Sequence, residues 1–373
     1  MKVGIVCPYS PFRSGGVMAQ VDGQVRELTR RGYDVKVITP RPQSYVGVPP
    51  DGYIFIGQSR RIHTPQHTTA EISIISNPEV VDQAFRDENF DVLHIHEPLI
   101  PILALQLLNK ITCPTVGTFH AALPDTFLAQ AIAGSIGPYK RSIFKRLDVV
   151  TAVSQTATSY ITDDIDPKTT NFIPNGINVD SFVTRNQKDR DPLSVLYVGR
   201  LEKRKGLRYL LAAFARLQQL LPEATLQVAG DGPERNMLTS RARQLKLSGV
   251  TFLGQVDEKE KRRLLSRCGL FTSPALYGES FGVVLLEAMA AGAVTVAGNN
   301  SGYESVLSGT GRLSLVAPKM AEEYARRMQL LLTNAALRDV WRAWASAEVR
   351  KFDFASVVDE YEKIYRELVP VAR

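Results

Sequence analysis

The chain has 373 residues, a length that suits two domains of ordinary size better than one. Its composition is globular, with 44% hydrophobic and 22% charged residues, and its formal net charge of +7 favours an anionic partner without identifying one. Cys7, Cys113 and Cys268 stand far apart, which argues against a zinc ribbon or a disulfide framework and favours a reducing compartment. The sequence has no stretch of about 18 uncharged apolar residues, so no membrane-spanning helix is predicted.

The first half of the chain alternates between predicted strands and helices. The strand KVGIVCPYS, which we do not interpret as a signal peptide, leads through the loop PFRSGG into a helix that ends at Gly32. Further short strands are predicted at YDVKVIT, FDVLHIHEP, PTVGTFH, DVVTAVS and NFIPNG. This alternation indicates βαβ crossovers and a mostly parallel sheet with helices on both faces.

The same alternation restarts after a charged stretch at 183–192 that is typical of a linker. Strands are predicted at LSVLYVGR, TLQVAGDGP, VTFLGQV, LFTSPA, AVTVAG and LSLVA. We therefore predict an α/β protein with two Rossmann-like, doubly wound domains, residues 1–173 and 174–352. The amphipathic helix within 353–373 is expected to pack back on the first domain. Ligands of such sheets bind at the carboxyl ends of the strands, and two facing domains form a cleft.

Small residues join the first predicted strand to the first helix. Ser14, Gly15 and Gly16 let the backbone approach a ligand and leave helix N–H groups free for an anion, with an ordinary tight turn as the alternative. Their spacing is not G-x-G-x-x-G, which disfavours a nicotinamide cofactor.

Three histidines stand on predicted strands of the first domain. His120 closes PTVGTFH, where either a general acid–base histidine or a structural one is expected. His94 and His96 are two residues apart and point to one face, but Glu97 is predicted to point the other way. Packing at the strand end is therefore a better interpretation than a metal site.

A basic turn, GRLEKRKGLR, follows the first strand of the second domain. Arg200 leaves the strand and Lys205 precedes a helix near Gly206, so a guanidinium and an ammonium converge at a helix start. This arrangement predicts a diphosphate clamp, with a solvated basic turn as the alternative. The sequence is not a P-loop, because G-x-x-x-x-G-K-[ST] is absent.

Two carboxylates, Glu279 and Glu287, lie in the otherwise apolar stretch ALYGESFGVVLLEAMAAG. Ser280 is the expected N-cap, and the first helical turn is predicted to contain Phe281, Gly282 and Val283. Helical rise would separate the two acids by about 10–12 Å, which does not fit the carboxyl pair of a glycosidase. We expect the acids to hold different parts of one long ligand, one of them gripping a ribose.

Other sites are disfavoured by the sequence. The pairs Asp164 and Asp166, and Asp189 and Asp191, have no apolar strand leading into them and are interpreted as turn residues. GNNSGYES does not provide the G-x-S-x-G of a serine hydrolase. Because both Asp pairs are interpreted as turn residues, we expect no metal site.

Together these segments resemble the family-4 retaining glycosyltransferases. Glu279 and Glu287 match the family's E-x7-E motif, and GRLEKRKG, IPNGIN, VAGDGP and FLGQV resemble its other segments. The likeness covers nearly the whole chain and implies the GT-B fold, with the active site between the two domains. In the first domain, CPYSPFRSGGV, DVLHIHEP and TFH are most similar to bacterial phosphatidylinositol α-mannosyltransferases.

The resemblance implies that the second domain holds a nucleotide-diphosphosugar and the first domain the acceptor. Arg200 and Lys205 would neutralise the leaving diphosphate, so that no cofactor is required and a divalent metal at most stimulates. Of the other implied donor contacts, Glu287 would bind the ribose and Val256 the base. Glu279, together with the Phe281 and Gly282 N–H groups, would bind the sugar. His120 would also contact the sugar, and Gly16 would lie near the phosphates. Gly15, Ser280 and Val283 complete the donor set, and Tyr9 is a candidate acceptor contact.

The implied reaction is same-face substitution, in which the leaving phosphate takes the acceptor proton. Mannose from GDP-mannose and a lipid such as phosphatidylinositol are the first expectation. Two departures from the family pattern favour a different acceptor: NPEVVDQAFRDENF replaces a basic helix, and Leu99 stands where Asn is usual. The alternative is a UDP-glucose or UDP-N-acetylglucosamine enzyme acting on diacylglycerol or on a soluble sugar or cyclitol.

Two interpretations without sugar transfer are weaker. A nucleotide-sugar-binding protein without catalysis would not need His120, Arg200, Lys205 and both motif acids, and an epimerase would not need the E-x7-E context. We expect a cytoplasmic protein that does not bind nucleic acid. Contact with an anionic membrane would use the basic stretch 137–146, for which a solvated helix face is the alternative.

Overall fold

The computed structural model describes the chain except for residues 12–14, 44, 64–68, 74–78, 80, 82–84, 86–87, 101–102, 122–136, 160, 162–169, 184–189 and 371–373. The contacts divide the chain into two units. Unit 1 comprises Met1–Gly176 and Phe354–Arg373, and unit 2 comprises Ile177–Asp353. The change of unit at Gly176 lies three residues after the predicted boundary at 173 and before the charged stretch 183–192, of which residues 184–189 lie outside the described residues.

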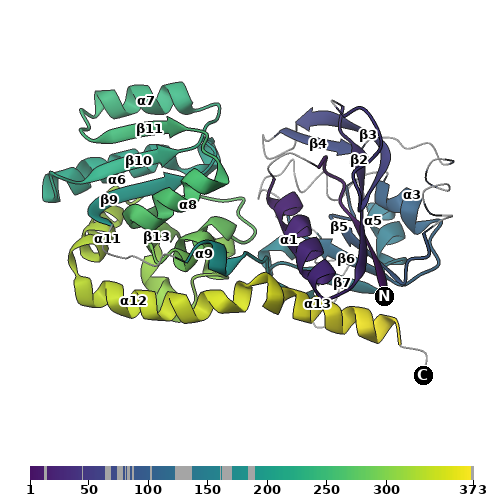
Figure 1. The fold of residues 1–373 in the computed structure, drawn as a ribbon. Coiled ribbons are helices and arrows are strands. Elements are labelled where there is room, and N and C mark those ends of the chain that lie inside the picture. Colours follow the sequence, from purple (N-terminus) through teal and green to yellow (C-terminus); the bar gives the residue numbers. More distant parts are fainter. Residues whose placement is uncertain are drawn as a thin grey trace. The chain divides into compact units, whose positions relative to one another are not determined.

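Unit 1 contains an eight-stranded sheet in the order β4-β3-β2-β1-β5-β6-β7-β8 (Figure 1). The strands are β1 (Lys2–Val6), β2 (Asp34–Arg41), β3 (Tyr53–His63), β4 (Thr69–Ser73), β5 (Val92–His96), β6 (Thr115–Phe119), β7 (Val149–Ala152) and β8 (Asn171–Phe172). All neighbours are parallel except β3 and β4, an antiparallel edge pair that was not predicted. The fully buried strands β5 and β6 explain the continuous apolar runs in the sequence.

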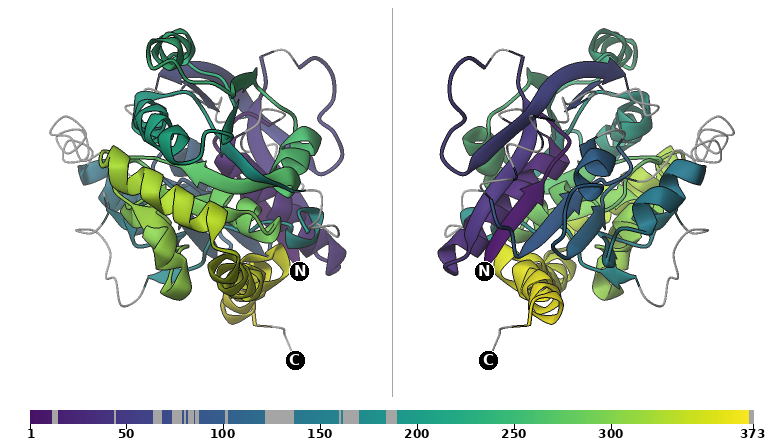
Figure 2. Two further views of the ribbon diagram at one scale, coloured as in Figure 1. Left: turned by 90° about the vertical axis from the view of Figure 1, so that its left-hand side faces the viewer. Right: turned by 90° about the vertical axis from the view of Figure 1, so that its right-hand side faces the viewer.

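The helices of unit 1 are α1 (Gly16–Arg30), α3 (Leu103–Leu108), α5 (Gly137–Phe144), the 3-10 turn η1 (Thr156–Thr158) and the C-terminal α13 (Phe354–Leu368). Helix α13 completes the core of this unit, because Val358 and Tyr365 are buried in one cluster with Val3 and Ile5 of β1. In both views of Figure 2, α13 lies beside the N-terminal strand.

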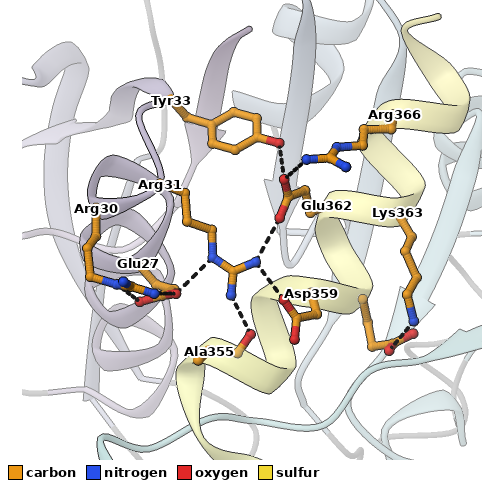
Figure 3. A network of polar contacts seen from close by, with 10 residues as sticks. Glu27, Arg30, Arg31, Tyr33, Ala355, Asp359, Glu362, Lys363 and Arg366 are labelled. Carbon is orange, nitrogen blue, oxygen red and sulfur yellow. Dashed lines mark hydrogen bonds and ion pairs between the residues drawn. The ribbon is translucent and has the colours of Figure 1, made fainter.

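One arginine fastens α13 to α1 (Figure 3). The Arg31 guanidinium donates to Asp359 (2.6 Å), to Glu362 (2.7 Å) and to the carbonyl of Ala355 (2.7 Å). The Tyr33 hydroxyl donates to Glu362 as well, at 2.6 Å. These contacts fix the position of α13 along α1, so residues on its buried face have defined partners.

Unit 2 contains a six-stranded parallel sheet in the order β11-β10-β9-β12-β13-β14 (Figure 1). Its strands are β9 (Asp191–Val198), β10 (Thr225–Ala229), β11 (Val250–Gly254), β12 (Cys268–Ser273), β13 (Val294–Gly298) and β14 (Leu315–Val316). Its helices are α6 (Leu207–Leu220), α7 (Arg235–Gln244), α8 (Glu258–Arg267), α9 (Val283–Ala290), α10 (Ser301–Glu304), α11 (Ala321–Thr333) and α12 (Ala335–Glu348). The 3-10 turns are η2 (Val179–Ser181), η4 (Lys203–Lys205), η5 (Gly309–Ser314) and η6 (Val349–Phe352).

Both sheets confirm the predicted α/β class with two Rossmann-like units. In each sheet the strand order reverses next to its first strand, between β1 and β5 in unit 1 and between β9 and β12 in unit 2. Ligands of such sheets bind at the carboxyl ends of the strands at these reversals. Among the predicted site residues, Gly15 and Gly16 follow β1, Arg200 and Lys205 follow β9, and Glu279 follows β12. His120 follows β6 and Val256 follows β11, each one or two strands from the reversal.

Candidate active site

The basic turn after β9 is held against the segment that follows β12. Gly206 has a left-handed backbone (φ 71°), and an added Cβ would lie 2.0 Å from the carbonyl oxygen of Pro274, so only glycine fits there. The Leu276 N–H also donates to the Arg204 carbonyl at 2.8 Å. This close approach brings the side chains of Arg204 and Lys205 in η4 beside Glu279.

Three cations and two carboxylates meet at this junction. Glu279 Oε1 lies 2.7 Å from Lys205 Nζ and 2.7 Å from Arg204 Nη1. Glu202, which is almost fully buried, pairs with Arg204 at 3.0 Å and with Arg200 at 2.7 Å. The predicted clamp residues Arg200 and Lys205 are therefore each paired with a carboxylate, and Arg204 connects the two pairs.

Arg204 is charged although it lies largely inside the protein. Burial alone would lower the pKa of its guanidinium, but the carboxylates of Glu279 and Glu202 raise it above the usual value. The guanidinium also donates to the Gly278 carbonyl at 3.1 Å. Three positive and two negative side chains leave this cluster with one net positive charge, which favours an anionic ligand.

Helix α9 begins later than predicted. Its N-cap is Gly282 in a left-handed conformation (φ 109°), a residue without a side chain that could cap the helix, and Val283 is its first residue. Phe281 is 3% exposed, and its ring centroid lies 5.8 Å from that of Phe352. The prediction that Ser280 caps the helix and that Phe281 and Gly282 lie in its first turn is therefore wrong, because burial of Phe281 and the bend at Gly282 come before the helix.

The second motif acid has a different partner. Glu287, 9% exposed on α9, accepts from Lys261 Nζ at 2.7 Å, and Lys261 also pairs with Glu258 at 3.0 Å. Burial alone would lower the pKa of Lys261, but Glu287 and then Glu258 raise it above its usual value. Burial raises the pKa of Glu287, and Lys261 acts in the opposite direction. The 2.7 Å contact beside a second carboxylate is that of an ion pair. Glu279 and Glu287 thus bind separate cations.

Val256, the predicted base contact, lies between β11 and α8 and is half-buried. The next residue, Asp257, caps α8 by accepting from the Glu260 N–H at 2.7 Å. This cap fixes the backbone at Val256, where the resemblance places the nucleotide base.

His120 lies just beyond β6 and is 7% exposed. Its Nε2 is 2.7 Å from His96 Nδ1, and its Nδ1 is 3.2 Å from Asn175 Oδ1. Glu97 Oε1 accepts from the backbone N–H groups of His120 and Ala121, both at 2.6 Å. The side chain and the backbone of His120 are therefore both oriented by unit 1.

Burial lowers the pKa of His120 to about 4, although its contact with Asn175 acts in the opposite direction. Burial, and then the charge of His120, lower the pKa of His94 to about 3. The pKa of His96 is also lowered by burial. All three imidazoles are therefore neutral at neutral pH.

The other predicted residues of unit 1 occupy less enclosed positions. Gly15 is the N-cap of α1 and Gly16 its first residue, both exposed, and an added Cβ on either would meet no atom within 4 Å. Tyr9 is half-buried, and its carbonyl accepts from the Thr39 hydroxyl at 2.7 Å. Ser14, Asp164, Asp166 and Asp189 lie outside the described residues.

Glu202, Arg204 and Lys261 join the site without having been predicted. Glu202 and Arg204 lie inside the basic turn GRLEKRKGLR, two and four residues after Arg200, so their spacing could have indicated them. No local pattern indicated Lys261, because its partner Glu287 lies 26 positions away on another helix.

Two wider features concern the part of the chain that the structure describes. Within it, no group of three or more His, Cys, Asp or Glu side chains is arranged to hold a metal ion. None of its helices is long and apolar enough to cross a membrane. In α5, Lys140 is buried, so the basic stretch 137–146 does not present all its cations on one exposed face.

Comparison with known families and proteins gives matches along nearly the whole chain. Residues 14–181 match the family described as Glycosyltransferase Family 4, and residues 179–347 match Glycosyl transferases group 1. The chain is 32% identical to the phosphatidyl-myo-inositol mannosyltransferase of Mycobacterium tuberculosis strain H37Rv, over 98% of this chain and 96% of that protein.

Solved structures are similar over the same extent. Sucrose-phosphate synthase from Thermosynechococcus elongatus superposes with a TM-score of 0.77 at 21% identity and covers 100% of both chains. An Anabaena protein solved with UDP-glucose gives a TM-score of 0.75 at 18% identity, over 98% of this chain and 100% of that one. At these identities the likeness concerns the fold.

Proposed function

Because the chain belongs to the family-4 glycosyltransferases of the GT-B fold, we propose that it transfers mannose from GDP-mannose to a lipid acceptor such as phosphatidylinositol, with retention of configuration. Membership of the family makes the chain a hexosyltransferase. The choice of sugar, nucleotide and lipid is supported by one observation, the 32% identity over 98% of the chain to a phosphatidyl-myo-inositol mannosyltransferase.

The cluster after β9 supports the role of unit 2 in binding the donor diphosphate. Lys205 and Arg204 share one carboxylate, Glu279, and Arg200 pairs with Glu202. A diphosphate that approaches these cations would find their positions already fixed, so little side-chain entropy is lost on binding. Glu279 then accepts from sugar hydroxyls and Glu287 from the ribose, while Val256 contacts the base.

The proposed chemistry needs no carboxylate nucleophile. The bond between the anomeric carbon and the phosphate oxygen breaks, and the acceptor oxygen attaches to the same face of the sugar. The acceptor proton passes to the departing phosphate oxygen, whose charge Arg200 and Lys205 stabilise. Glu279 and Glu287 bind different cations, which supports a mechanism without a carboxylate pair.

Further parts of the proposal follow from the same chemistry. We expect catalysis without a bound metal, because side-chain cations neutralise the diphosphate. His120 remains the predicted sugar contact, Gly15 and Gly16 the predicted phosphate loop and Tyr9 the predicted acceptor contact. A peripheral position on the cytoplasmic face of a membrane would bring the enzyme to a lipid acceptor.

A second candidate changes the substrates and keeps the reaction. The Anabaena protein of similar fold was solved with UDP-glucose, which supports a UDP-sugar donor as the alternative. The acidic stretch 77–90 and Leu99 support an acceptor other than phosphatidylinositol, such as diacylglycerol, a soluble sugar or a cyclitol.

Product analysis by mass spectrometry tests the proposal. The purified protein is offered GDP-mannose, UDP-glucose or UDP-N-acetylglucosamine with liposomes that contain phosphatidylinositol or diacylglycerol, with and without EDTA. We expect mannosylated phosphatidylinositol from GDP-mannose, an α-linkage by NMR, and an unchanged rate in EDTA.

Two variants in the same turn provide the control. Lys205→Ala should lower the rate about a hundredfold or more, since it removes charge stabilisation at the leaving group, whereas Lys203→Ala, at an exposed neighbour, should not. A product only from a UDP-sugar would replace the proposed substrates with the second candidate. Loss of activity in EDTA would refute the account of the basic cluster.

A further inference from the structure

A buried chain of polar contacts connects helix α13 to His120 within unit 1. The Tyr365 hydroxyl lies 2.8 Å from Gln24 Nε2 and 2.6 Å from His94 Nδ1. Gln24 Oε1 lies 3.1 Å from His96 Nε2, and His96 Nδ1 lies 2.7 Å from His120 Nε2. Every side chain in this chain of contacts is buried, so water does not substitute for a missing partner.

Tyr365 sets the direction of these hydrogen bonds because its hydroxyl carries one proton. A phenol is a strong donor and an imidazole nitrogen a strong acceptor, so the proton goes to His94 Nδ1. His94 then holds its own proton on Nε2 and donates to Thr118 Oγ1, which lies 2.6 Å away. The Tyr365 oxygen is left as an acceptor, and only the amide N–H of Gln24 can donate to it.

The direction set at Tyr365 passes along the remaining contacts. With its NH₂ group turned to Tyr365, Gln24 presents its carbonyl oxygen to His96, so His96 carries its proton on Nε2. His96 Nδ1 is then an acceptor, and His120 must donate to it from Nε2. A neutral imidazole has one N–H, so His120 Nδ1 is left as an acceptor.

This result constrains the contact between His120 and Asn175. His120 Nδ1 and Asn175 Oδ1 are 3.2 Å apart, and two acceptors do not form a hydrogen bond. A half-turn of the amide exchanges its oxygen and nitrogen and restores the bond. A ligand hydroxyl that reaches His120 Nδ1 would likewise find an acceptor.

We propose that Tyr365, acting through Gln24 and His96, is a positioning residue that holds His120 in the Nε2-protonated tautomer. His120 thereby offers Nδ1 as an acceptor to a hydroxyl group of a sugar substrate. The importance of this tautomer for transfer rests on the proposed function, whereas the tautomer itself does not. Helix α13 therefore supplies a group on which the state of His120 depends.

Imidazole NMR tests the tautomer without any substrate. The chain has five histidines, so the ¹⁵N signals of His120 can be assigned by comparing the protein with a His120→Gln variant. We expect the Nε2-protonated form in the wild type and a mixture of tautomers in Tyr365→Phe. Without the Tyr365 hydroxyl, the Gln24 amide group keeps only His94 Nδ1, 3.0 Å from its Nε2, as its partner on this side. His94 is then no longer held as an acceptor at Nδ1, so the amide can face it with either its NH₂ group or its oxygen.

Tyr361→Phe is the matched control. Tyr361 lies one turn earlier on α13 and is also buried, but its hydroxyl is 3.4 Å from Thr118 and makes no described contact with Gln24. This variant should keep the tautomer of His120 and a transfer rate within about twofold of wild type. A changed tautomer in Tyr361→Phe as well would mean that general packing of α13, and not the Tyr365 hydroxyl, controls His120.

Kinetics of a double variant test the path through Gln24. Tyr365→Phe should lower kcat/KM about fivefold to tenfold, and Gln24→Met should lower it by a similar factor. If Tyr365 acts through Gln24, Tyr365→Phe should have no further effect in the Gln24→Met background, whereas independent structural effects would multiply. Multiplying effects, or an unchanged tautomer in Tyr365→Phe, would overturn the proposal.

The NMR and kinetic results separate this proposal from the proposed function. If the wild type transfers no sugar but Tyr365→Phe alters the tautomer of His120, the positioning of His120 stands and the function fails. If the wild type is active and the tautomer does not respond to Tyr365, the function stands and the positioning fails.

Discussion

Arg204 shows how a single side chain can organise a cluster of like charges. A turn with four cations and no acids would hold its side chains apart by repulsion, but Arg204 lies between Glu202 and Glu279 at 3.0 and 2.7 Å. Its planar guanidinium can bind two carboxylates at once, which a lysine ammonium does less well. The two acids therefore fix the positions of the cations around them.

Replacing Arg204 by Ala should reduce both stability and diphosphate binding. Removal of the guanidinium leaves Glu202 buried beside only Arg200, so we expect the free energy of unfolding to fall by about 2 kcal/mol. Lys205 would then be the only cation left on Glu279, and we expect the dissociation constant of GDP to rise about tenfold. Chemical denaturation and isothermal titration calorimetry measure the two effects.

Lys203→Ala and Arg204→Lys test the explanation. Lys203 is exposed in the same turn, and its replacement should change neither quantity appreciably. Arg204→Lys should restore only part of the loss, since one ammonium cannot bridge both acids in the same way. Full restoration by lysine would show that charge alone matters and that bridging does not.

At the scale of elements, helix α13 packs against the rest of unit 1 through the ring of Phe354, which lies between Gly23 and Gly176. An added Cβ on Gly23 of α1 would lie 1.9 Å from Phe354 Cζ, and one on Gly176 would lie 2.6 Å from Phe354 Cδ1. The Phe354 ring, at the start of α13, therefore occupies space that any larger residue would take. This contact and the Arg31 cluster hold α13 at both its first turn and its middle.

Gly23→Ala should destabilise the protein although alanine is the better helix former. Alanine in place of glycine in a helix interior is favourable by up to about 1 kcal/mol, but the clash with Phe354 should cost about 1–3 kcal/mol. We therefore expect a lower melting temperature, measured by circular dichroism. Phe354→Leu should relieve the clash, so that the double variant is more stable than the sum of the single effects predicts.

The sequence predicted the strand alternation well, because buried parallel strands are continuous apolar runs. It did not predict the start of α9, where Ser280 looked like an ordinary cap, since the bend at Gly282 depends on burial of Phe281 against Phe352. Contacts between residues far apart in the sequence could not be predicted either. Gln24 and Tyr365 are 341 positions apart, and no local pattern connects them.

The whole molecule has an uneven distribution of two residue types. All five histidines of the chain lie between positions 63 and 120, which belong to unit 1. Its two tryptophans, Trp341 and Trp344, lie in unit 2. Histidine titration therefore affects one unit, and tryptophan fluorescence reports on the other.

Acid should consequently destabilise unit 1 before unit 2. In the folded protein the pKa values of His94 and His120 are about 3 and about 4, below the ordinary value near 6.5. At a pH between the folded value and 6.5, the unfolded chain therefore binds protons that the folded chain does not. Their contribution to stability is complete above about pH 6.5 and is lost as the pH falls, by about 2 kcal/mol for each residue at pH 5. Thermal unfolding followed by circular dichroism should thus begin at a lower temperature at pH 5.0 than at pH 7.5. The transition followed by tryptophan fluorescence should move little between the two pH values. His120→Gln should shrink the shift, and a tryptophan transition that moves as far as the circular dichroism transition would contradict an origin in unit 1.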